Sequence, residues 1–177
     1  KMHLFLYLSL VFSAIEEPTH LVLLKGGDDG SKFYRIPAIV MAPDNKTLVT
    51  ATDKRWYNNA DLPQKIDVVI KTSKDNGKTW SSSKMITPGL SDPIGYGDPA
   101  LIVDHQRNAI FCLFSGDKGT FASTKDAPQR NFYCVSYDNG ETWSNMVEIT
   151  HMLYGKDCKD PIRREFYSNF LTSGNGF

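Results

Sequence analysis

The amino-acid sequence predicts an all-β protein, and more narrowly part of a β-propeller. An eight-residue motif occurs twice, at 73–80 and at 136–143, with six of the eight positions identical. Short runs rich in Val, Ile, Leu and Phe lie before and between the two copies, separated by turn residues. Repetition at a fixed period indicates a repeated unit, and several short strands per unit suit a four-stranded propeller blade. A β-sandwich is the alternative, but a sandwich does not require the repeated turn.

The composition is that of an ordinary folded domain. The chain has 177 residues, of which 41% are apolar and 23% charged, which excludes a disordered or collagen-like protein. Its 20 basic and 20 acidic residues give a net charge of zero, which argues against nucleic acid as a partner. Three cysteines cannot pair completely, and their spacing fits no common zinc motif. Cys112 and Cys134 are expected to be buried thiols, with a single disulfide as the alternative.

The first residues have the pattern of a secretory signal peptide. Lys1 precedes an apolar run at 4–12, and the small residues Ser13 and Ala14 follow it near a cleavage site. A buried strand or helix is the alternative. The run is too short to span a bilayer, and no other segment is long and apolar enough. The expected organisation is a signal peptide at 1–14 and one domain at 15–177, in a secreted, periplasmic or luminal protein.

Strand-like runs follow one another along the rest of the chain. The spacing from Ser73 to Ser136 is 63 residues, so 177 residues hold fewer than three units. A propeller needs roughly four to eight blades to close, which predicts that the chain is the N-terminal part of a longer protein, with about two and a half blades. Helical periodicity is absent except around 147–154. The expected strands are 20–25, 34–42, 46–52, 65–72, 99–104, 109–115 and 131–135.

The centre of each repeated motif is the tripeptide Asp-Asn-Gly, which favours a turn. Glycine tolerates positive φ, and the aspartate side chain accepts hydrogen bonds from nearby backbone N–H groups. Asp75 and Asp138 are therefore expected to fasten the turns of two hairpins. A calcium loop is the alternative, but the further ligands and the terminal Glu of such a loop are missing.

Three positions outside the turns are candidates for chemistry. Arg35 lies in an apolar run, where a guanidinium needs an anionic partner or a wet cavity, and its planar fork suits a carboxylate. Asp61 lies in a polar loop after the strand that ends near Arg55, and Asp98 comes directly before another strand. Loops at strand ends often carry site residues. The structural alternatives are an ion pair for Arg35, a solvated loop side chain for Asp61 and a turn cap for Asp98.

Together, the run Tyr-Arg-Ile-Pro at 34–37 and the two Ser-x-Asp-x-Gly-x-Thr-Trp turns resemble the sialidase (neuraminidase) family of exo-acting glycoside hydrolases, in its bacterial-type branch. The runs at 95–100 and 173–176 share this resemblance, which extends from Lys25 to the C-terminus. The resemblance implies a six-bladed β-propeller with its site at the axis, and chemistry that needs no metal or cofactor. It also identifies the turns as Asp boxes, which lie away from the site: Ser73, Asp75, Gly77, Thr79, Trp80, Ser136, Asp138, Gly140, Thr142 and Trp143.

The resemblance also implies roles for individual residues. Arg35 matches the first arginine of the triad that binds the carboxylate of sialic acid, and Asp61 matches the catalytic acid/base. Arg55 and Asp98 match residues that contact the 4-hydroxyl and N-acetyl side of the sugar.

Two aromatic residues, Trp56 and Phe121, are expected to line the N-acetyl pocket. The other two arginines, the nucleophilic tyrosine and its glutamate come from later blades of the family fold, and similar residue types at 163–167 do not match those motifs. The resemblance thus implies a retaining exo-α-sialidase in the full-length protein, acting on sialylated glycoproteins, glycolipids and oligosaccharides, with this chain inactive alone. The alternatives are a non-catalytic propeller that binds sialoglycans and a trans-sialidase.

Overall fold

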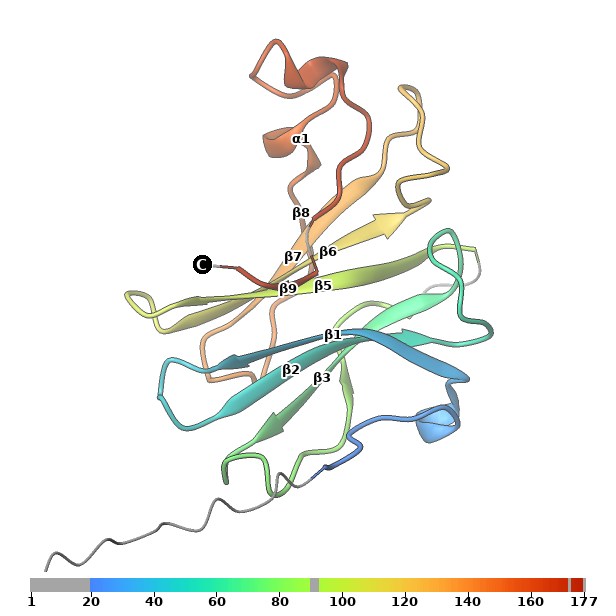
Figure 1. The fold of residues 1–177 in the computed structure, drawn as a ribbon. Helices are drawn as coiled ribbons and strands as arrows, with labels where there is room; N and C mark the ends of the chain where they lie inside the picture. The colour runs from blue at the N-terminus through green and yellow to red at the C-terminus, as the bar shows by residue number, and fades with distance from the viewer. Residues whose placement is uncertain (1–19, 90–92, 172, 177) are drawn as a thin grey trace, which may run out of the picture.

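The computed structural model describes residues 20–89, 93–171 and 173–176, and most of their regular structure is β-strand. Figure 1 shows two sheets that lie one above the other as separate layers. The first sheet is antiparallel, with its strands in chain order: β1 (Phe33–Met41), β2 (Leu48–Arg55), β3 (Ile66–Ser73) and β4 (Lys84–Met85).

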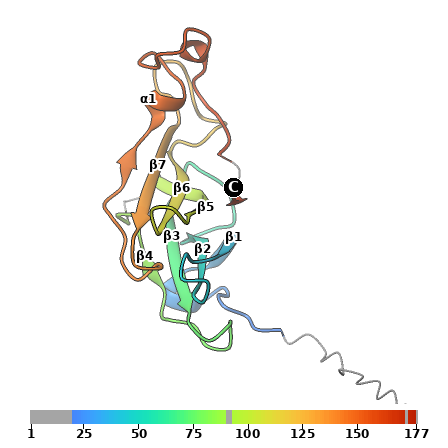
Figure 2. The same ribbon diagram turned by 90° about the vertical axis from the view of Figure 1, so that its left-hand side faces the viewer.

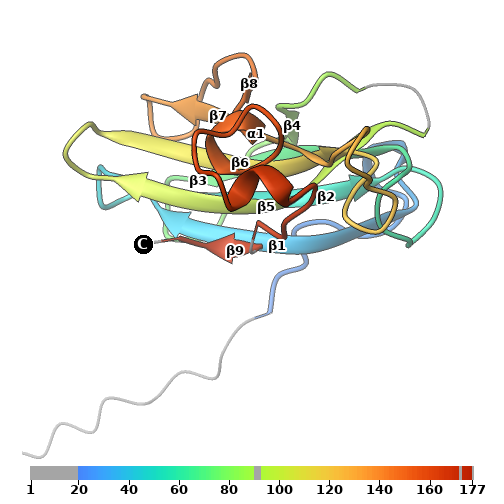
Figure 3. The same ribbon diagram turned by 90° about the horizontal axis from the view of Figure 1, so that it is seen from above.

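The second sheet repeats this arrangement with the next part of the chain. Its four main strands are again antiparallel neighbours, and a two-residue strand, β9, pairs in parallel with the first of them. Figure 3 shows that β9 also lies beside β1 of the first sheet. Its strands are β5 (Gly95–Asp104), β6 (Ala109–Asp117), β7 (Arg130–Ser136), β8 (Val147–Glu148) and β9 (Gly174–Asn175). The short helices are η1 (Asp28–Gly30), α1 (Thr150–Leu153) and η2 (Arg163–Glu165), and Figure 2 shows α1 and η1 at opposite ends of the molecule.

The all-β prediction is confirmed. Each of the two sheets carries one copy of the repeated motif after its third main strand, so the sheet is the repeated unit. Within the described residues the two sheets do not close on each other, which is the arrangement expected for part of a propeller.

An apolar core lies between the two sheets, which meet mainly where β5 crosses β1, β2 and β3. Tyr96 stands edge-on to Phe114 and Phe132, with ring centroids 5.9 and 5.4 Å away, a geometry that aromatic pairs favour. The core residues are Ala38, Ala42, Val49, Ala51, Val68, Ile70, Tyr96, Leu101, Ile110, Cys112, Phe114, Phe132 and Cys134.

The cysteines are buried free thiols, as expected for Cys112 and Cys134, and Cys158 is also free and buried. Cys112 and Cys134 lie opposite each other in the register of β6 and β7. Burial raises the pKa of the Cys112 thiol, so this side chain behaves as a small apolar core residue.

The first strand of each sheet along the chain, β1 and β5, carries the same irregularity. Their register shifts at residues 35–38 and 97–100, and each shift contains a proline. The residue before that proline has positive φ in both strands, 54° at Ile36 and 58° at Asp98. Proline has no backbone N–H to donate to a neighbouring strand, so within sheets it is found at edges and bulges. A bulge redirects the side chains beside it. The two bulges therefore mark the places where these strands present Arg35 and Asp98.

Two predicted elements differ from the structure. The strand expected at 20–25 is wrong, because these residues form no regular structure and Leu21 and Val22 are exposed. A strand-like composition gives a strand only where a neighbouring strand pairs with it. The stretch 147–154 is helical only in α1, because its first residues join the second sheet as β8.

The predicted signal peptide, 1–14, lies outside the described residues. In the part of the chain that the structure describes, no helix combines the length and the apolar character needed to cross a membrane.

The two repeated turns have the same hydrogen bonds. Asp75 accepts the backbone N–H of Thr79 at 2.8 Å, and the hydroxyls of Ser73 and Thr79 at 2.9 and 2.6 Å. Asp138 makes the same three bonds to the equivalent serine and threonine. The bonds from Thr79 lower the pKa of Asp75 to about 2. The interpretation of both aspartates as residues that fasten turns is confirmed.

The repeated turns and the candidate site lie at opposite ends of the strands. In the ladder between β2 and β3, Arg55 pairs with Ile66 at one end and Leu48 pairs with Ser73 at the other. The first repeated turn begins at Ser73, whereas Asp61 lies in the loop that joins the opposite ends of the same two strands. The turns therefore shape each sheet without contributing to the site.

Candidate functional site

The structure brings Arg35 and Asp61 together. The loop between β2 and β3 folds back over β1, so that Arg35 Nη1 lies 3.2 Å from Asp61 Oδ1 and donates to the carbonyl of Asn59 at 3.1 Å. The side chains are 39% and 59% exposed, so the pair faces solvent. Among the described residues, the Nε and Nη2 edge of Arg35 has no hydrogen-bond partner, which leaves a planar pair of donors for a ligand carboxylate.

Arg55 supports this pair from within the protein. It is 1% exposed, and its Nη1 donates to Asp61 Oδ1 at 2.8 Å and to the carbonyls of Asn59 and Ala60. Its Nε and Nη2 donate to Asp53 Oδ2 at 3.2 and 2.8 Å. The guanidinium therefore holds the loop that carries Asp61, and most of its donors are used inside the protein.

Two further carboxylates, Asp53 and Asp98, lie close to Arg55. Asp53 is completely buried and accepts the backbone N–H of Asp98 at 2.9 Å. Burial raises the pKa of Asp53 to about 7 although Arg55 opposes the rise, and Asp98 adds to it. Burial also raises the pKa of Asp98, against the effect of Arg55.

A pocket of about 370 Å³ lies beside Arg35, Asp61 and Asp98. Charged side chains from β1, β5 and the β2–β3 loop form one part of its wall, and two phenylalanines, 94% and 63% exposed, form another. Such a mixture of a few polar groups and exposed rings suits a small ligand with both charged and apolar faces. The pocket is lined by Arg35, Ile36, Asp61, Leu62, Asp98, Ser115, Gly119, Thr120, Phe121 and Phe170.

The predicted site residues therefore fall into three positions. Arg35, Asp61, Asp98 and Phe121 line the pocket, and Arg55 lies behind it. The structure does not place Trp56 among the lining residues.

Trp56 instead belongs to a separate cluster beside β3. Its indole N–H donates to Asp67 Oδ2 at 2.7 Å, and the ammonium groups of Lys54 and Lys65 lie 4.0 and 4.4 Å from a Trp56 ring centroid. Asp67 is buried and also accepts bonds from the Thr87 hydroxyl and the Gly89 backbone. These contacts tie Trp56 to β3, away from the residues that line the pocket.

Sequence reasoning missed several residues of this site. Asp53 lies two positions before Arg55 on one strand, and residues at that spacing share a face, so the sequence did contain a signal for it. Ser115 is held by the buried Gln129 amide at 2.8 Å, and Thr120 donates to the same Gln129 at 2.7 Å. Phe170 comes from a segment without regular structure, and no sequence signal marks it.

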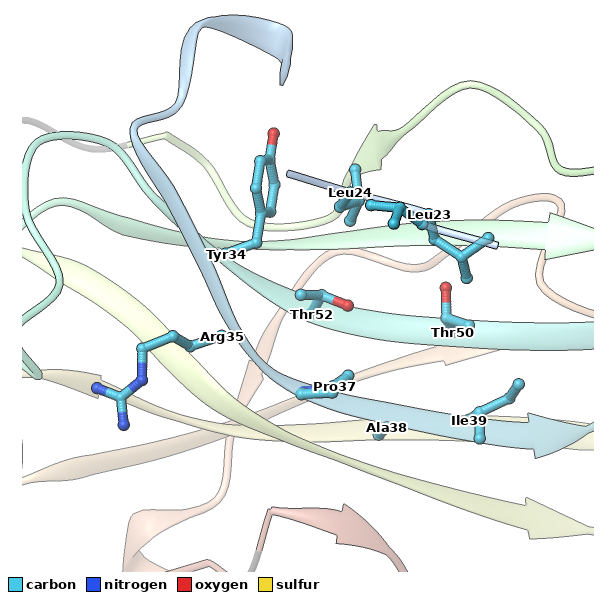
Figure 4. Close-up of a pocket in the computed structure, with 10 residues that line it drawn as sticks. Leu23, Leu24, Tyr34, Arg35, Pro37, Ala38, Ile39, Thr50 and Thr52 are labelled. Carbon is cyan, nitrogen blue, oxygen red and sulfur yellow. The ribbon is translucent and has the colours of Figure 1, made fainter. Parts of the chain in front are cut away.

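A second hollow, of about 430 Å³, lies beside β1 (Figure 4). In Figure 4, Leu23 and Leu24 lie in the upper part of the view with Tyr34, and the Arg35 side chain points away from Tyr34. Its wall is mainly apolar, and Arg35 is its one charged lining residue. Among the described residues, no group of three or more His, Cys, Asp or Glu side chains is arranged to hold a metal ion.

Three curated sialidases match most of the chain. The sialidase of Bacteroides fragilis is 29% identical over 180 residues, covering 93% of this chain and 31% of that protein. The sialidase of Micromonospora viridifaciens is 29% identical over 165 residues, covering 87% of this chain and 24% of that protein. The sialidase of Clostridium perfringens is 30% identical over 143 residues, covering 76% of this chain and 37% of that protein. The chain thus spans about a quarter to two fifths of the length of these relatives. No family model matches the chain.

Solved structures agree with these relatives. The Hadza microbial sialidase Hz136 superposes with a TM-score of 0.72 at 28% identity, covering 85% of this chain and 31% of that one. The intramolecular trans-sialidase from Ruminococcus gnavus superposes with a TM-score of 0.69 at 15% identity, covering 88% and 55%, which is a likeness in fold alone. Sequence and fold therefore agree over most of the chain, including the strand that carries Arg35 and the repeated turns. The chain belongs to the sialidase family and forms part of a sialidase β-propeller.

Proposed function

We propose that the full-length protein is a retaining exo-α-sialidase, which removes terminal sialic acid from glycoproteins, glycolipids and oligosaccharides. The observation that carries this proposal is the contact between Arg35 and Asp61, at 3.2 Å, on the wall of one pocket. A carboxylate-binding group and a proton-transfer group are thereby close enough to touch one monosaccharide. The family membership of the chain supports the same substrate class.

Arg35 would bind the substrate's negative charge. Sialic acid carries a carboxylate on its anomeric carbon, and the free edge of the Arg35 guanidinium matches a carboxylate with two parallel hydrogen bonds. The bond between Asp61 and Arg35 is made by Nη1, so it leaves that edge open. A bound carboxylate would fix the ring so that the anomeric carbon and its glycosidic oxygen lie near Asp61.

Asp61 would then act as acid and afterwards as base. In its protonated form it donates a proton to the glycosidic oxygen as the bond from that oxygen to the anomeric carbon breaks. In the second step the Asp61 carboxylate takes a proton from the water that releases the sugar from the enzyme. The exposed position of Asp61 allows both the leaving group and the water to reach it.

The nucleophile is expected from outside this chain. Sialidases use a tyrosine in place of the usual carboxylate nucleophile, because a carboxylate would repel the substrate's own charge. The similar residue types at 163–167 do not line the pocket, and two of them are paired elsewhere, Arg163 with Asp160 and Glu165 with Lys125. We place the tyrosine, its glutamate and two further arginines in the remainder of the full-length protein.

Two further assignments belong to the same proposal. The repeated turns fastened by Asp75 and Asp138 are the Asp boxes of the family, which agrees with their position at the end of the strands away from the pocket. The leader at 1–14 would carry the protein to a secreted, periplasmic or luminal compartment, where sialylated glycans occur.

Hydrolysis of a sialoside tests the proposal. The full-length protein and the 177-residue chain are incubated with sialyllactose, and the released sugar is followed by NMR. We expect the full-length protein to release the α-anomer of sialic acid first, and the chain alone to release none. Turnover by the chain alone would refute the assignment of the nucleophile to the remainder of the protein. Binding without turnover by the full-length protein would indicate a sialoglycan-binding module, and transfer of sialic acid to added lactose would indicate a trans-sialidase.

A further inference from the structure

One buried side chain connects the two sheets at the site. Asp53, in β2, pairs in register with Arg35 of β1 and is completely buried. Its Oδ2 accepts hydrogen bonds from Arg55, and its Oδ1 accepts the backbone N–H of Asp98 at 2.9 Å. Because β2 and β5 belong to different sheets, a single carboxylate fixes groups from both.

The local backbone of β5 is built to approach Asp53. A Cβ atom on Gly97 would lie 3.1 and 3.2 Å from the two Asp53 carboxylate oxygens, so a larger residue would crowd them. The next residue, Asp98, has a φ of 58°, a backbone conformation that is uncommon for residues other than glycine. The hydrogen bond from its N–H to Asp53 helps to hold this conformation in place.

Asp53 also reaches Asp61 through Arg55. Arg55 Nε and Nη2 bind Asp53, while its Nη1 binds Asp61 Oδ1 at 2.8 Å. With both ends of the planar guanidinium held, the position of the Asp61 carboxylate depends on that of Asp53. Asp61 and Asp98 line the same pocket. Asp53 is hydrogen-bonded to Arg55, which holds Asp61, and to the backbone N–H of Asp98.

We propose that Asp53 is a positioning residue that fixes Asp98 relative to Asp61, and thereby sets how the enzyme recognises the sugar's 4-hydroxyl side. This inference rests on the proposed sialidase function, and on the match of Asp98 to the family residue that contacts that side of the sugar. It assigns Asp53 no contact with the substrate, because its oxygens are used by Arg55 and by the Asp98 backbone. Asp53 therefore acts through Asp98 and through Arg55.

A purely structural role for Asp53 makes a different prediction, and the chain offers a matched control. Asp67 is also a completely buried aspartate in the first sheet, and it also binds three donors, from Trp56, Thr87 and Gly89. Asp67 does not line the pocket. Loss of either carboxylate should lower stability, but only loss of Asp53 should alter selectivity at the 4-hydroxyl.

The test uses the full-length protein with Asp53→Asn and, as the control, Asp67→Asn. The quantity measured is kcat/KM for a fluorogenic sialoside divided by kcat/KM for its 4-deoxy analogue. We expect this ratio to be about tenfold to a hundredfold in the wild type, since a group built to bind a hydroxyl discriminates against its absence. Asp53→Asn should bring the ratio close to 1, and Asp67→Asn should leave it at the wild-type value.

A second variant keeps the test decisive if Asp53→Asn does not fold. Gly97→Ala retains the Asp53 carboxylate but pushes a Cβ against it, and it should lower the same ratio. A wild-type ratio in Asp53→Asn would overturn the inference, and if that variant does not fold, a wild-type ratio in Gly97→Ala would do so. A ratio near 1 in the wild-type protein would also overturn it, as would an equal fall of the ratio in Asp67→Asn. An inactive wild-type protein would refute the proposed function, and the inference with it, whereas an active enzyme with unchanged selectivity would refute the inference alone.

Discussion

Replacement of Asp61 by alanine in the full-length protein should lower the rate of sialyllactose hydrolysis by on the order of 10² or more, the size of effect typical of a lost general acid. The sugar leaving group is a poor one and needs a proton as the glycosidic bond breaks. A sialoside with an activated aryl leaving group needs that proton much less, so its rate should fall far less.

KM should not rise in this variant. Asp61 accepts its bond from Arg35 Nη1 at 3.2 Å, so its loss leaves the Nε and Nη2 edge that would bind the substrate carboxylate unchanged. Its removal leaves Arg55 paired with Asp53, so the buried arginine keeps a partner. Steady-state kinetics with both substrates measure kcat and KM separately.

The matched control for Asp61 is Asp104→Ala. Asp104 also pairs with an arginine, Arg107 at 2.6 Å, but it is the last residue of β5, at the other end of that strand from Asp98, and it does not line the pocket. Its replacement should leave both rates unchanged. A similar fall for the natural and the activated substrates in Asp61→Ala would remove Asp61 from the role of acid.

Replacement of Arg35 by alanine should lower kcat/KM by about 10²- to 10³-fold, with KM raised. The loss of a charge-assisted, two-bonded contact to a carboxylate costs roughly 3–4 kcal/mol, and each 1.4 kcal/mol is a factor of about ten. Arg35→Lys should recover only part of the loss, because an ammonium keeps the charge but lacks the planar fork.

Arg107→Ala is the control for this variant. Arg107 pairs with a carboxylate as Arg35 does, but its side chain is 71% exposed and lies outside the pocket. Its loss should leave kcat/KM at the wild-type value. A KM within a factor of about three of the wild type in Arg35→Ala would show that Arg35 does not bind the substrate carboxylate.

The parts of the fold that depend on local chemistry were predicted from the sequence. The Asp-Asn-Gly tripeptides predicted turns whose hydrogen bonds are local, and Asp75 and Asp138 make those bonds. The repeat of the motif predicted a repeated sheet unit. The run at 20–25 was assigned wrongly, because its composition favours a strand while pairing depends on a neighbour that composition does not encode.

The site could be predicted only in part, because its residues come from distant segments. The resemblance drew attention to Arg35 and Asp61, and the structure places them in contact. Phe170 reaches the pocket from an irregular segment, and its position depends on tertiary packing alone. Asp53 was not singled out, because its burial depends on β5 crossing β2, a contact between two sheets.

A crystal structure of the full-length protein with bound sialic acid would show whether Arg35 and Asp61 contact the same sugar. We expect the sugar carboxylate within hydrogen-bond distance of the Nε and Nη2 edge of Arg35, and the anomeric oxygen within hydrogen-bond distance of Asp61, about 2.6–3.2 Å. Asp98 should face the 4-hydroxyl side of the same ring. A sugar that touches Arg35 but lies beyond the reach of Asp61, or that binds away from both, would contradict the account.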